Sequence, residues 1–148
     1  MVDVSHEMKD HADRAVADTK AAPGIDLDYT PESIQQVEHI LSVVYDSKPR
    51  GLLSRVLSRA LSGDEAAQVA RMYGSYIGET IRRTWGGQCE RDHAVAGAGS
   101  YPIECRGNQS FPLGWCYRRL MNGPEDNVWH KVLTIYLTNR DDNALRLD

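Results

Sequence analysis

Apolar residues recur at helical spacing along most of this chain and predict its main elements. Over residues 64–85 they fall on one helical face with a period of 3.6, and Gly86 and Gly87 follow. Ser62 and Glu65 form a capping-box pattern before this run, which predicts where the helix begins. This helix should be central to the fold. Its predicted inward residues are Ala66, Val69, Ala70, Tyr73, Ile77, Thr80 and Ile81.

The same periodicity predicts helices before and after the central one. Residues 4–20 have a narrow apolar face, whereas residues 31–46 have a broad one, with Thr30 as the N-cap and Pro31 at the first position. Glu38 belongs to the polar face of that second helix and is expected to face solvent. Two further helices are predicted, over residues 113–121 and 128–139.

Residues 50–61 form a short basic amphipathic segment. A helix packed on the core, a helix on a membrane surface and a helix that docks a partner all share this pattern. The core helix with solvated arginines is the favoured interpretation, and the net acidity of the chain weakens the case for a membrane surface.

After Gly87 the helical period gives way to short extended stretches separated by Gly, Ser and Pro. The strands are expected near residues 88–91, 94–95 and 101–106, and residues 107–110 are expected to form a turn. The chain therefore predicts a small antiparallel sheet.

These elements together predict an α+β fold. We expect a single domain of four to six helices, with the long central helix packed on a small antiparallel sheet. The domain is placed at residues 25–140, preceded by a loosely attached helical segment, 1–24, and followed by a frayed tail, 141–148. The length of 148 residues is that of one ordinary domain.

Charge and composition narrow the classes of function. The formal net charge is −4, which disfavours a nonspecific nucleic-acid binder, since phosphate affinity comes from Lys and Arg. It favours a protein partner that is basic. No apolar run is long enough to span a bilayer, and the first residues lack the pattern of a signal peptide. The expected location is therefore the cytoplasm.

Three cysteines, Cys89, Cys105 and Cys116, leave at least one thiol outside any internal disulfide. A zinc site formed by these three cysteines and His93 would lack the two closely spaced ligand pairs of specific zinc signatures. A catalytic thiol assisted by His93 or His130 can also be drawn, but such pairings arise by chance. Buried or incidental cysteines are favoured, and we predict neither a metal nor a cofactor.

Glu79 is the most informative candidate site residue, because it interrupts an otherwise apolar helical stretch. Arg82 and Arg83 follow at spacings that reach it on the helix surface. A structural ion pair is the favoured interpretation, and it predicts that Glu79→Ala mainly lowers the melting temperature. The alternative is a partly buried carboxylate that anchors a ligand or partner, with Trp85 lining a cleft.

Arg118 and Arg119 form a second arginine pair, close to the acidic residues Glu125 and Asp126. Local ion pairing is the favoured explanation. An anion site built from both arginine pairs is the alternative, because guanidinium groups bind carboxylate and phosphate. No nucleotide-binding loop, nucleophile elbow or zinc-protease motif is present. The sequence therefore favours binding over catalysis.

Residues 73–83 with Gly86 and Gly87, and the later run Arg-Arg-Leu-Met-Asn-Gly-Pro-Glu-Asp that ends at Asp126, resemble small bacterial domains of unknown function. Those domains have a Gly-x-Tyr-x-Gly-Glu helix, a short sheet and an Arg-Leu-x-Asn-Gly turn. The resemblance covers residues 27–138. It implies a stand-alone or accessory bacterial domain, some relatives of which lie near toxin or secretion systems, and it carries over no catalytic residue.

Two classes of function follow. The first is a non-catalytic protein-binding module, for instance an immunity or inhibitor protein that neutralises a cognate bacterial toxin by direct binding. The second is a small-molecule-binding or enzymatic domain that holds an anionic ligand near Glu79, Arg82 and Arg83. The candidate binding residues are Glu79, Arg82, Arg83, Trp85, Arg118 and Arg119.

Overall fold

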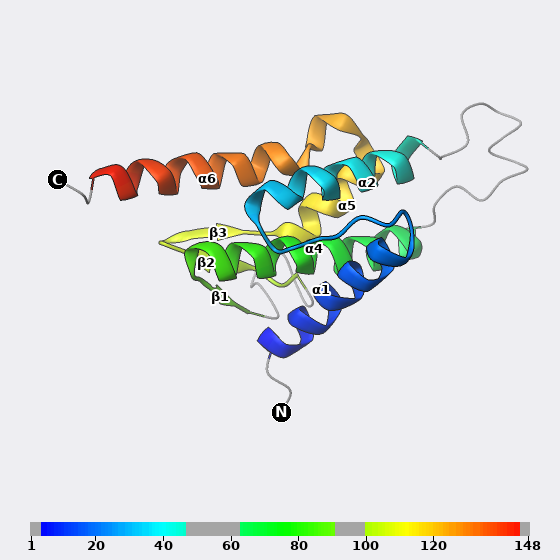
Figure 1. Cartoon of the computed structure of the whole chain (residues 1–148), viewed down its shortest axis with the longest axis horizontal. Coiled ribbons are helices and arrows are strands. Elements are labelled where there is room, and N and C mark those ends of the chain that lie inside the picture. The colour runs from blue at the N-terminus through cyan, green and yellow to red at the C-terminus, as the bar shows by residue number, and fades with distance from the viewer. Residues whose placement is uncertain (1–3, 47–62, 91–99, 146–148) are drawn as a thin grey trace, which may run out of the picture.

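The computed structural model describes residues 4–46, 63–90 and 100–145. The predicted α+β fold is confirmed: the described residues form five α-helices and a three-stranded antiparallel sheet (Figure 1). The helices are α1 (Val4–Ala21), α2 (Ile34–Asp46), α4 (Gly63–Trp85), α5 (Pro112–Asn122) and α6 (Val128–Leu145). Two short 3-10 helices, η1 (Pro31–Ser33) and η2 (Pro124–Asp126), precede α2 and α6, and the strands are β1 (Gln88–Cys89), β2 (Ile103–Cys105) and β3 (Asn108–Ser110).

Helix α4 is the central element, as its long apolar pattern predicts. It packs most extensively against α1 and α5, and it also contacts β2. Helices α2 and α6 lie on the other side of α4 from α1, with α2 contacting both α5 and α6 (Figure 1). Because α4 is covered on several faces, its residues from Tyr73 to Ile81 are all buried.

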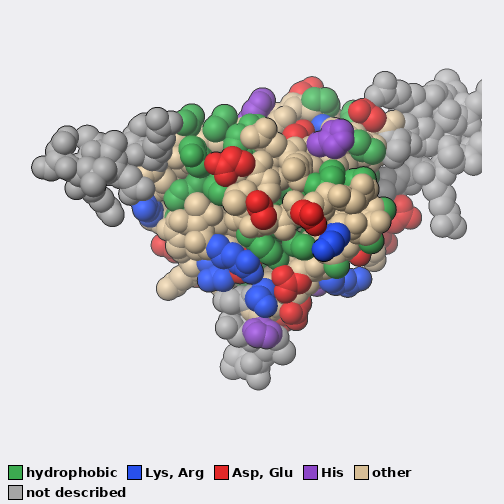
Figure 2. Space-filling view, viewed as in Figure 1, with side chains coloured by type: hydrophobic (Ala, Val, Ile, Leu, Met, Phe, Trp, Pro, Cys, Tyr) green, Lys and Arg blue, Asp and Glu red, His purple; other side chains and the backbone are tan. Residues whose placement is uncertain are grey.

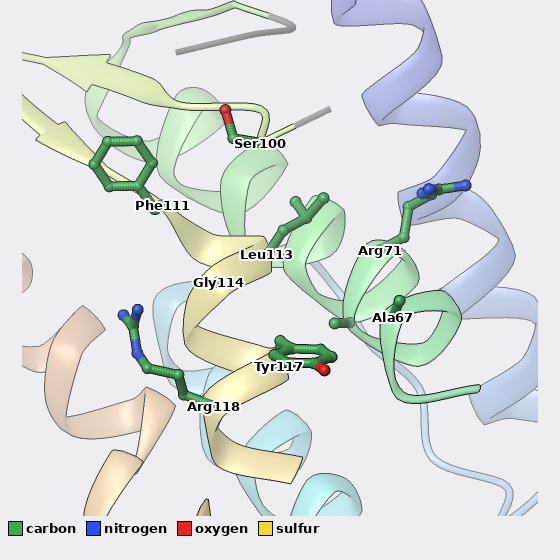
Figure 3. Close-up of a pocket in the computed structure, with 9 residues that line it drawn as sticks. Ala67, Arg71, Ser100, Phe111, Leu113, Gly114, Tyr117 and Arg118 are labelled. Atoms are coloured by element: carbon green, nitrogen blue, oxygen red, sulfur yellow. The ribbon is translucent and has the colours of Figure 1, made fainter. Parts of the chain in front are cut away.

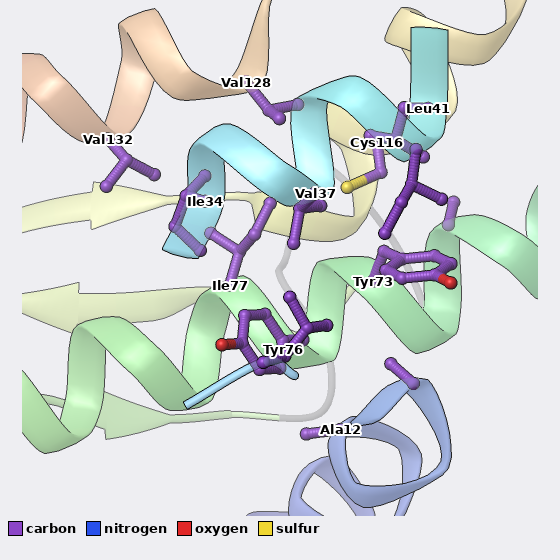
Figure 4. Close-up of a cluster of buried hydrophobic side chains, with 14 of the residues drawn as sticks. Ala12, Ile34, Val37, Leu41, Tyr73, Tyr76, Ile77, Cys116, Val128 and Val132 are labelled. Carbon is purple, nitrogen blue, oxygen red and sulfur yellow. The ribbon is translucent and has the colours of Figure 1, made fainter. Parts of the chain in front are cut away.

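The core is one cluster to which all five helices contribute. Side chains such as Ala12, Val37, Tyr76, Cys116 and Val132 converge between the helices (Figure 4). Helix α1 belongs to this cluster through Met8, Ala12 and Ala15, each at most 1% exposed. The small residues Ala12 and Ala15 let a helix with a narrow apolar face lie close to α4, and the longer Met8 side chain reaches Gly78 of that helix. The domain boundaries at residues 24 and 140 stay a prediction.

The predicted N-cap before α2 and the predicted glycine stop after α4 are confirmed, whereas Ser62 of the predicted capping box lies outside the described residues. The Thr30 side chain accepts a hydrogen bond from the backbone N–H of Ser33 at 3.3 Å, which makes it the predicted N-cap. The first turn after Pro31 is 3-10, and α2 follows from Ile34. At the other end, Gly86 and Gly87 have φ of +79° and +136°, values that terminate α4 without a side-chain penalty.

The sheet corrects one prediction. Residues 107–110 were expected to form a turn, but Asn108–Ser110 is strand β3, and Cys105 pairs with Asn108 across the hairpin. The turn is instead Arg106 and Gly107, both with positive φ, which suits a two-residue hairpin connection. The polar side chains of β3 suggested a turn because this edge strand is largely exposed. The expected strand at 94–95 and the basic segment at 50–61 lie outside the described residues.

The last helix is longer than predicted. The sequence indicated fraying after Asn139, where the apolar pattern ends, yet α6 continues to Leu145. Residues 140–145 include good helix formers such as Arg, Ala and Leu, which extend a helix already fixed by packing upstream.

Gly74 is required for the contact between α4 and α5. A Cβ at this position would lie 2.6 Å from the Cα of Leu113, so the backbone of α5 occupies the space that a side chain needs. We expect Gly74→Ala to lower the free energy of unfolding by about 2 kcal/mol, measured by urea denaturation, because the overpacking exceeds the gain in helix propensity. Gly114→Ala is the matched control, since its new Cβ would meet nothing closer than 3.8 Å. Equal effects of the two substitutions would contradict this account.

Candidate functional site

Glu79 is completely buried and held by two arginines from its own helix. One carboxylate oxygen accepts from Arg82 Nη2 at 2.6 Å and from Arg83 Nε at 2.8 Å. The other accepts from Arg82 Nε at 2.9 Å. Both oxygens are therefore engaged, and the negative charge is compensated within the same helix.

Two tyrosines extend this cluster to neighbouring elements. The Arg83 guanidinium lies 3.7 Å from the centroid of the Tyr29 ring, and that ring stacks on Tyr76 at 4.8 Å. The Tyr29 hydroxyl donates to Asp13 of α1 at 2.7 Å, and Tyr76 Oη accepts from the Tyr29 backbone N–H at 2.8 Å. The cluster thus ties α1 and the connection between α1 and α2 to the end of α4.

The ionisation of Glu79 follows from its contacts. Burial acts to raise the pKa of this carboxyl, but the hydrogen bonds and charges of Arg82 and Arg83 lower it more, so the net shift of the pKa is downward. Glu79 is therefore charged at neutral pH, and with both oxygens engaged it is suited to holding structure together. Among the two interpretations of the sequence, this geometry favours the structural ion pair.

The lowered pKa predicts a pH dependence of stability. Because the carboxylate is favoured in the folded state, its contribution is fully present above the unfolded-state pKa and is lost as the pH falls through the lower folded-state pKa. Thermal melts of the wild type should therefore lose more stability in acid than melts of Glu79→Gln, which cannot titrate there. Parallel acid profiles for the two proteins would argue against an ionised Glu79.

Arg119 forms a second buried ion pair, with a partner that the sequence did not indicate. Its Nε donates to Glu38 Oε1 at 2.6 Å, and Glu38 Oε2 accepts from the backbone N–H of Val128, the first residue of α6, at 3.1 Å. The side chains of Arg119 and Glu38 are 3% and 12% exposed. The expectation that Glu38 faces solvent was wrong, because α5 and the start of α6 cover that face of α2. Only the tertiary contacts identify this pair.

Arg118 follows the predicted local pairing. Its Nε lies 3.9 Å from Asp126 Oδ1, and half of its side chain is exposed. Lys131 also approaches Asp126, at 3.6 Å. Arg118 therefore keeps a weak and solvent-accessible partner, unlike its buried neighbour in the chain.

The structure does not bring the two arginine pairs together into an anion site. Helix α5 contacts α4 through Leu113 at Gly74 and through Tyr117 at Gly63. Arg82 lies eight residues beyond Gly74, about 12 Å further along the helix, in the direction opposite to Gly63. Each arginine pair is instead bound by carboxylates in its own part of the molecule.

Trp85 and the cysteines also take packing roles. Trp85 makes an edge-to-face contact with Tyr136 of α6 at 6.2 Å. Cys116 is fully buried in the core, and burial raises the pKa of its thiol, as it does for Cys105. Within the described ranges no group of three His, Cys, Asp or Glu side chains could hold a metal ion, and His93 lies outside them.

A groove between α4 and α5 was not indicated by the sequence. The cavity has a volume of about 420 Å³ and is lined by small residues and by apolar side chains. Arg71 stands at one side and Arg118 at the other, with Leu113 and Tyr117 between them (Figure 3). Only the i, i+4, i+8 spacing of Leu113, Tyr117 and Met121 could have suggested an apolar stripe. The lining residues are Ala67, Ala70, Arg71, Ser100, Phe111, Leu113, Gly114, Tyr117 and Arg118.

The fold and these sites define an α+β protein whose buried charges are compensated internally and whose helices α4 and α5 leave an open groove. Comparison with protein families, curated proteins and solved structures finds no match to this chain. Of the helices in the described part, none is both long and apolar enough to cross a membrane. Function must therefore be inferred from the groove and the charged clusters themselves.

Proposed function

We propose that this chain is a non-catalytic protein-binding module that holds a partner in the groove between α4 and α5. The observation that carries the proposal is an apolar stripe on α5 that the fold leaves accessible. Tyr117, which lines the groove, is 38% exposed, and Met121, one helical turn further along α5, is 41% exposed. Large exposed apolar side chains beside a concave surface are typical of helix or peptide recognition sites.

The charged clusters support binding over catalysis. A general acid or base needs an ionisable group that can reach a reacting atom. Glu79 is 0% exposed and both of its oxygens accept hydrogen bonds from arginines. The Glu38 carboxylate is likewise engaged by Arg119 and by the start of α6. These groups stabilise a rigid scaffold, which lowers the entropic cost of presenting a binding surface.

An immunity or inhibitor protein that neutralises a cognate bacterial toxin is the specific form that we propose for this module. The resemblance to bacterial domains that lie near toxin or secretion systems supports this form. The net charge of −4 would accelerate association with a toxin that is basic overall. The expected complex is one in which the toxin is blocked by a bound surface and no bond is made or broken.

The test is capture of a stoichiometric partner by the tagged full chain from its native cell, with identification by mass spectrometry. The groove variant carries Tyr117→Asp and Met121→Asp, two exposed positions at which folding should survive. The control is Leu137→Asp, since Leu137 is 46% exposed on α6 and does not line the groove. Circular dichroism should show native helix content in both variants. We expect the wild type and the control to retain the partner and the groove variant to lose it.

Two other outcomes would contradict the proposal. A partner that all three proteins retain binds outside the groove, which refutes the site. If no partner is captured, the result favours the alternative of a small-molecule-binding domain. The next experiment is then a thermal-shift screen of anionic metabolites. A ligand that raises the melting temperature of the wild type but not of Glu79→Gln would favour that alternative.

A further inference from the structure

We infer that the partner segment entering the groove between α4 and α5 is acidic and amphipathic, with apolar side chains flanked by Asp or Glu. This inference rests on the proposed function and specifies the chemistry of its partner. It follows from the charges on the two sides of the groove, from the character of its floor and from the placement of both in Figure 3.

The two arginines of the groove differ from the arginines of the buried clusters. Arg71 is exposed, and among the described residues it has no ion-pair partner. Arg118 is 50% exposed and meets Asp126 only at 3.9 Å. By contrast, Arg82 and Arg119 donate to carboxylates at 2.6 Å. Arg71 and Arg118 therefore remain able to bind carboxylates from outside, and guanidinium groups do so with two parallel hydrogen bonds.

Among the described residues, the lining between these arginines is mostly apolar and includes no acid. Ala67, Ala70 and Gly114 provide little side-chain volume, so the groove is open at their positions, and Phe111, Leu113 and Tyr117 provide apolar walls. None of the nine lining residues is Asp or Glu. The local charge of the groove is thus positive, although the whole chain is negative.

The positions of the two arginines set the pattern of the segment. In Figure 3, Arg71 and Arg118 extend to opposite sides, with Leu113 and Tyr117 between them. A segment that pairs with both arginines must place acidic groups on each side of its apolar side chains. An amphipathic helix does this, because residues three or four apart share a face and the flanking positions point sideways.

The acidic segment is compatible with the expected steering of a basic toxin, because the two effects act over different distances. Net charge influences approach over about 8 Å in physiological salt, whereas contact is decided by adjacent groups. On the face in Figure 2, acidic and basic side chains are interspersed, so the net charge does not describe each local surface. The groove is where the local and net charges have opposite signs.

The test uses random peptides displayed on phage and selected on the tagged full chain. The best binder is then synthesised with a fluorophore, and its dissociation constant is measured by anisotropy. The groove variant carries Arg71→Glu and Arg118→Glu. The control carries Lys9→Glu and Lys20→Glu, which changes the net charge equally on α1, outside the groove. We expect enriched peptides to place Asp or Glu on both sides of apolar residues, and the groove variant to bind them about tenfold more weakly than the control does.

The inference is overturned if the selected peptides are basic or uncharged, if no peptide is enriched, or if both variants weaken binding equally. Equal weakening would mean that only net charge matters. These failures differ from failure of the proposed function, which is decided by the cellular partner and by Tyr117→Asp with Met121→Asp. A cellular partner lost by that apolar variant but retained by the arginine variant leaves the function standing and refutes the acidic segment.

Discussion

Replacing Glu38 with alanine is expected to lower the free energy of unfolding by about 3–5 kcal/mol, the cost of stranding a buried charge. The substitution removes the partner of Arg119, a side chain that is only 3% exposed. It also removes the acceptor for the backbone N–H of Val128, so the start of α6 loses its hydrogen bond. Chemical denaturation monitored by circular dichroism measures the change.

The control for Glu38→Ala is Glu32→Ala, an exposed glutamate in η1 that should cost little. A double variant, Glu38→Leu with Arg119→Met, separates the stranded charge from lost packing. It should recover much of the loss, because neither charge is left buried alone. If Glu38→Ala and Glu32→Ala have the same stability, the ion pair seen between α2 and α5 does not contribute as described.

The second large effect is expected when Arg82 and Arg83 are both replaced by alanine. Glu79 would then keep a buried carboxylate without a cation, and we expect a loss of about 3 kcal/mol at neutral pH. This value is at the lower end of the range because both arginines are more than one third exposed and water reaches the site. Urea denaturation at several pH values provides the measurement.

The sign of the pH dependence distinguishes a stranded charge from a general loss of packing. Without the arginines, burial alone acts on Glu79, so its folded-state pKa should rise above the unfolded value. Its contribution is then present in acid and lost as the pH rises, the reverse of the wild type. Adding Glu79→Gln to the double variant should abolish this reversal. A variant whose stability falls in acid as steeply as that of the wild type would show that Glu79 is not the group concerned.

If the groove binds an acidic segment, the buried charged clusters stabilise the fold and the groove determines the affinity for the partner. Substitutions at Glu38 or Glu79 should change stability first and affinity only through unfolding. Substitutions at Tyr117 or Arg71 should change affinity with little effect on stability, because these side chains are accessible. The two sets of measurements therefore test the scaffold and the site independently.

Local sequence signals determined most of the helical scaffold. The period of the apolar residues in α4, the Thr30 cap, and Gly86 with Gly87 act within one or two helical turns, so they can be read without knowing the fold. The pairing of Glu79 with Arg82 and Arg83 was predictable for the same reason, since residues three and four apart are neighbours on a helix. The sequence also predicted a small antiparallel sheet, but it placed the hairpin turn at residues 107–110, whereas the turn is formed by Arg106 and Gly107.

Tertiary structure decided what depends on segments far apart in the chain. The sequence placed Glu38 in solvent because its own helix has a polar face there, and only the packing of α5 and α6 turned it into the partner of Arg119. Arg118 and Arg82 could have met, and the path of α5 along the first part of α4 keeps them apart. The groove exists because Gly74 admits the α5 backbone at one point while Ala67 and Ala70 leave space nearby. Helix periodicity depends on residues that are neighbours in the chain, so the sequence reveals it. A cavity depends on how two helices pack against each other, and that packing is set by contacts throughout the fold.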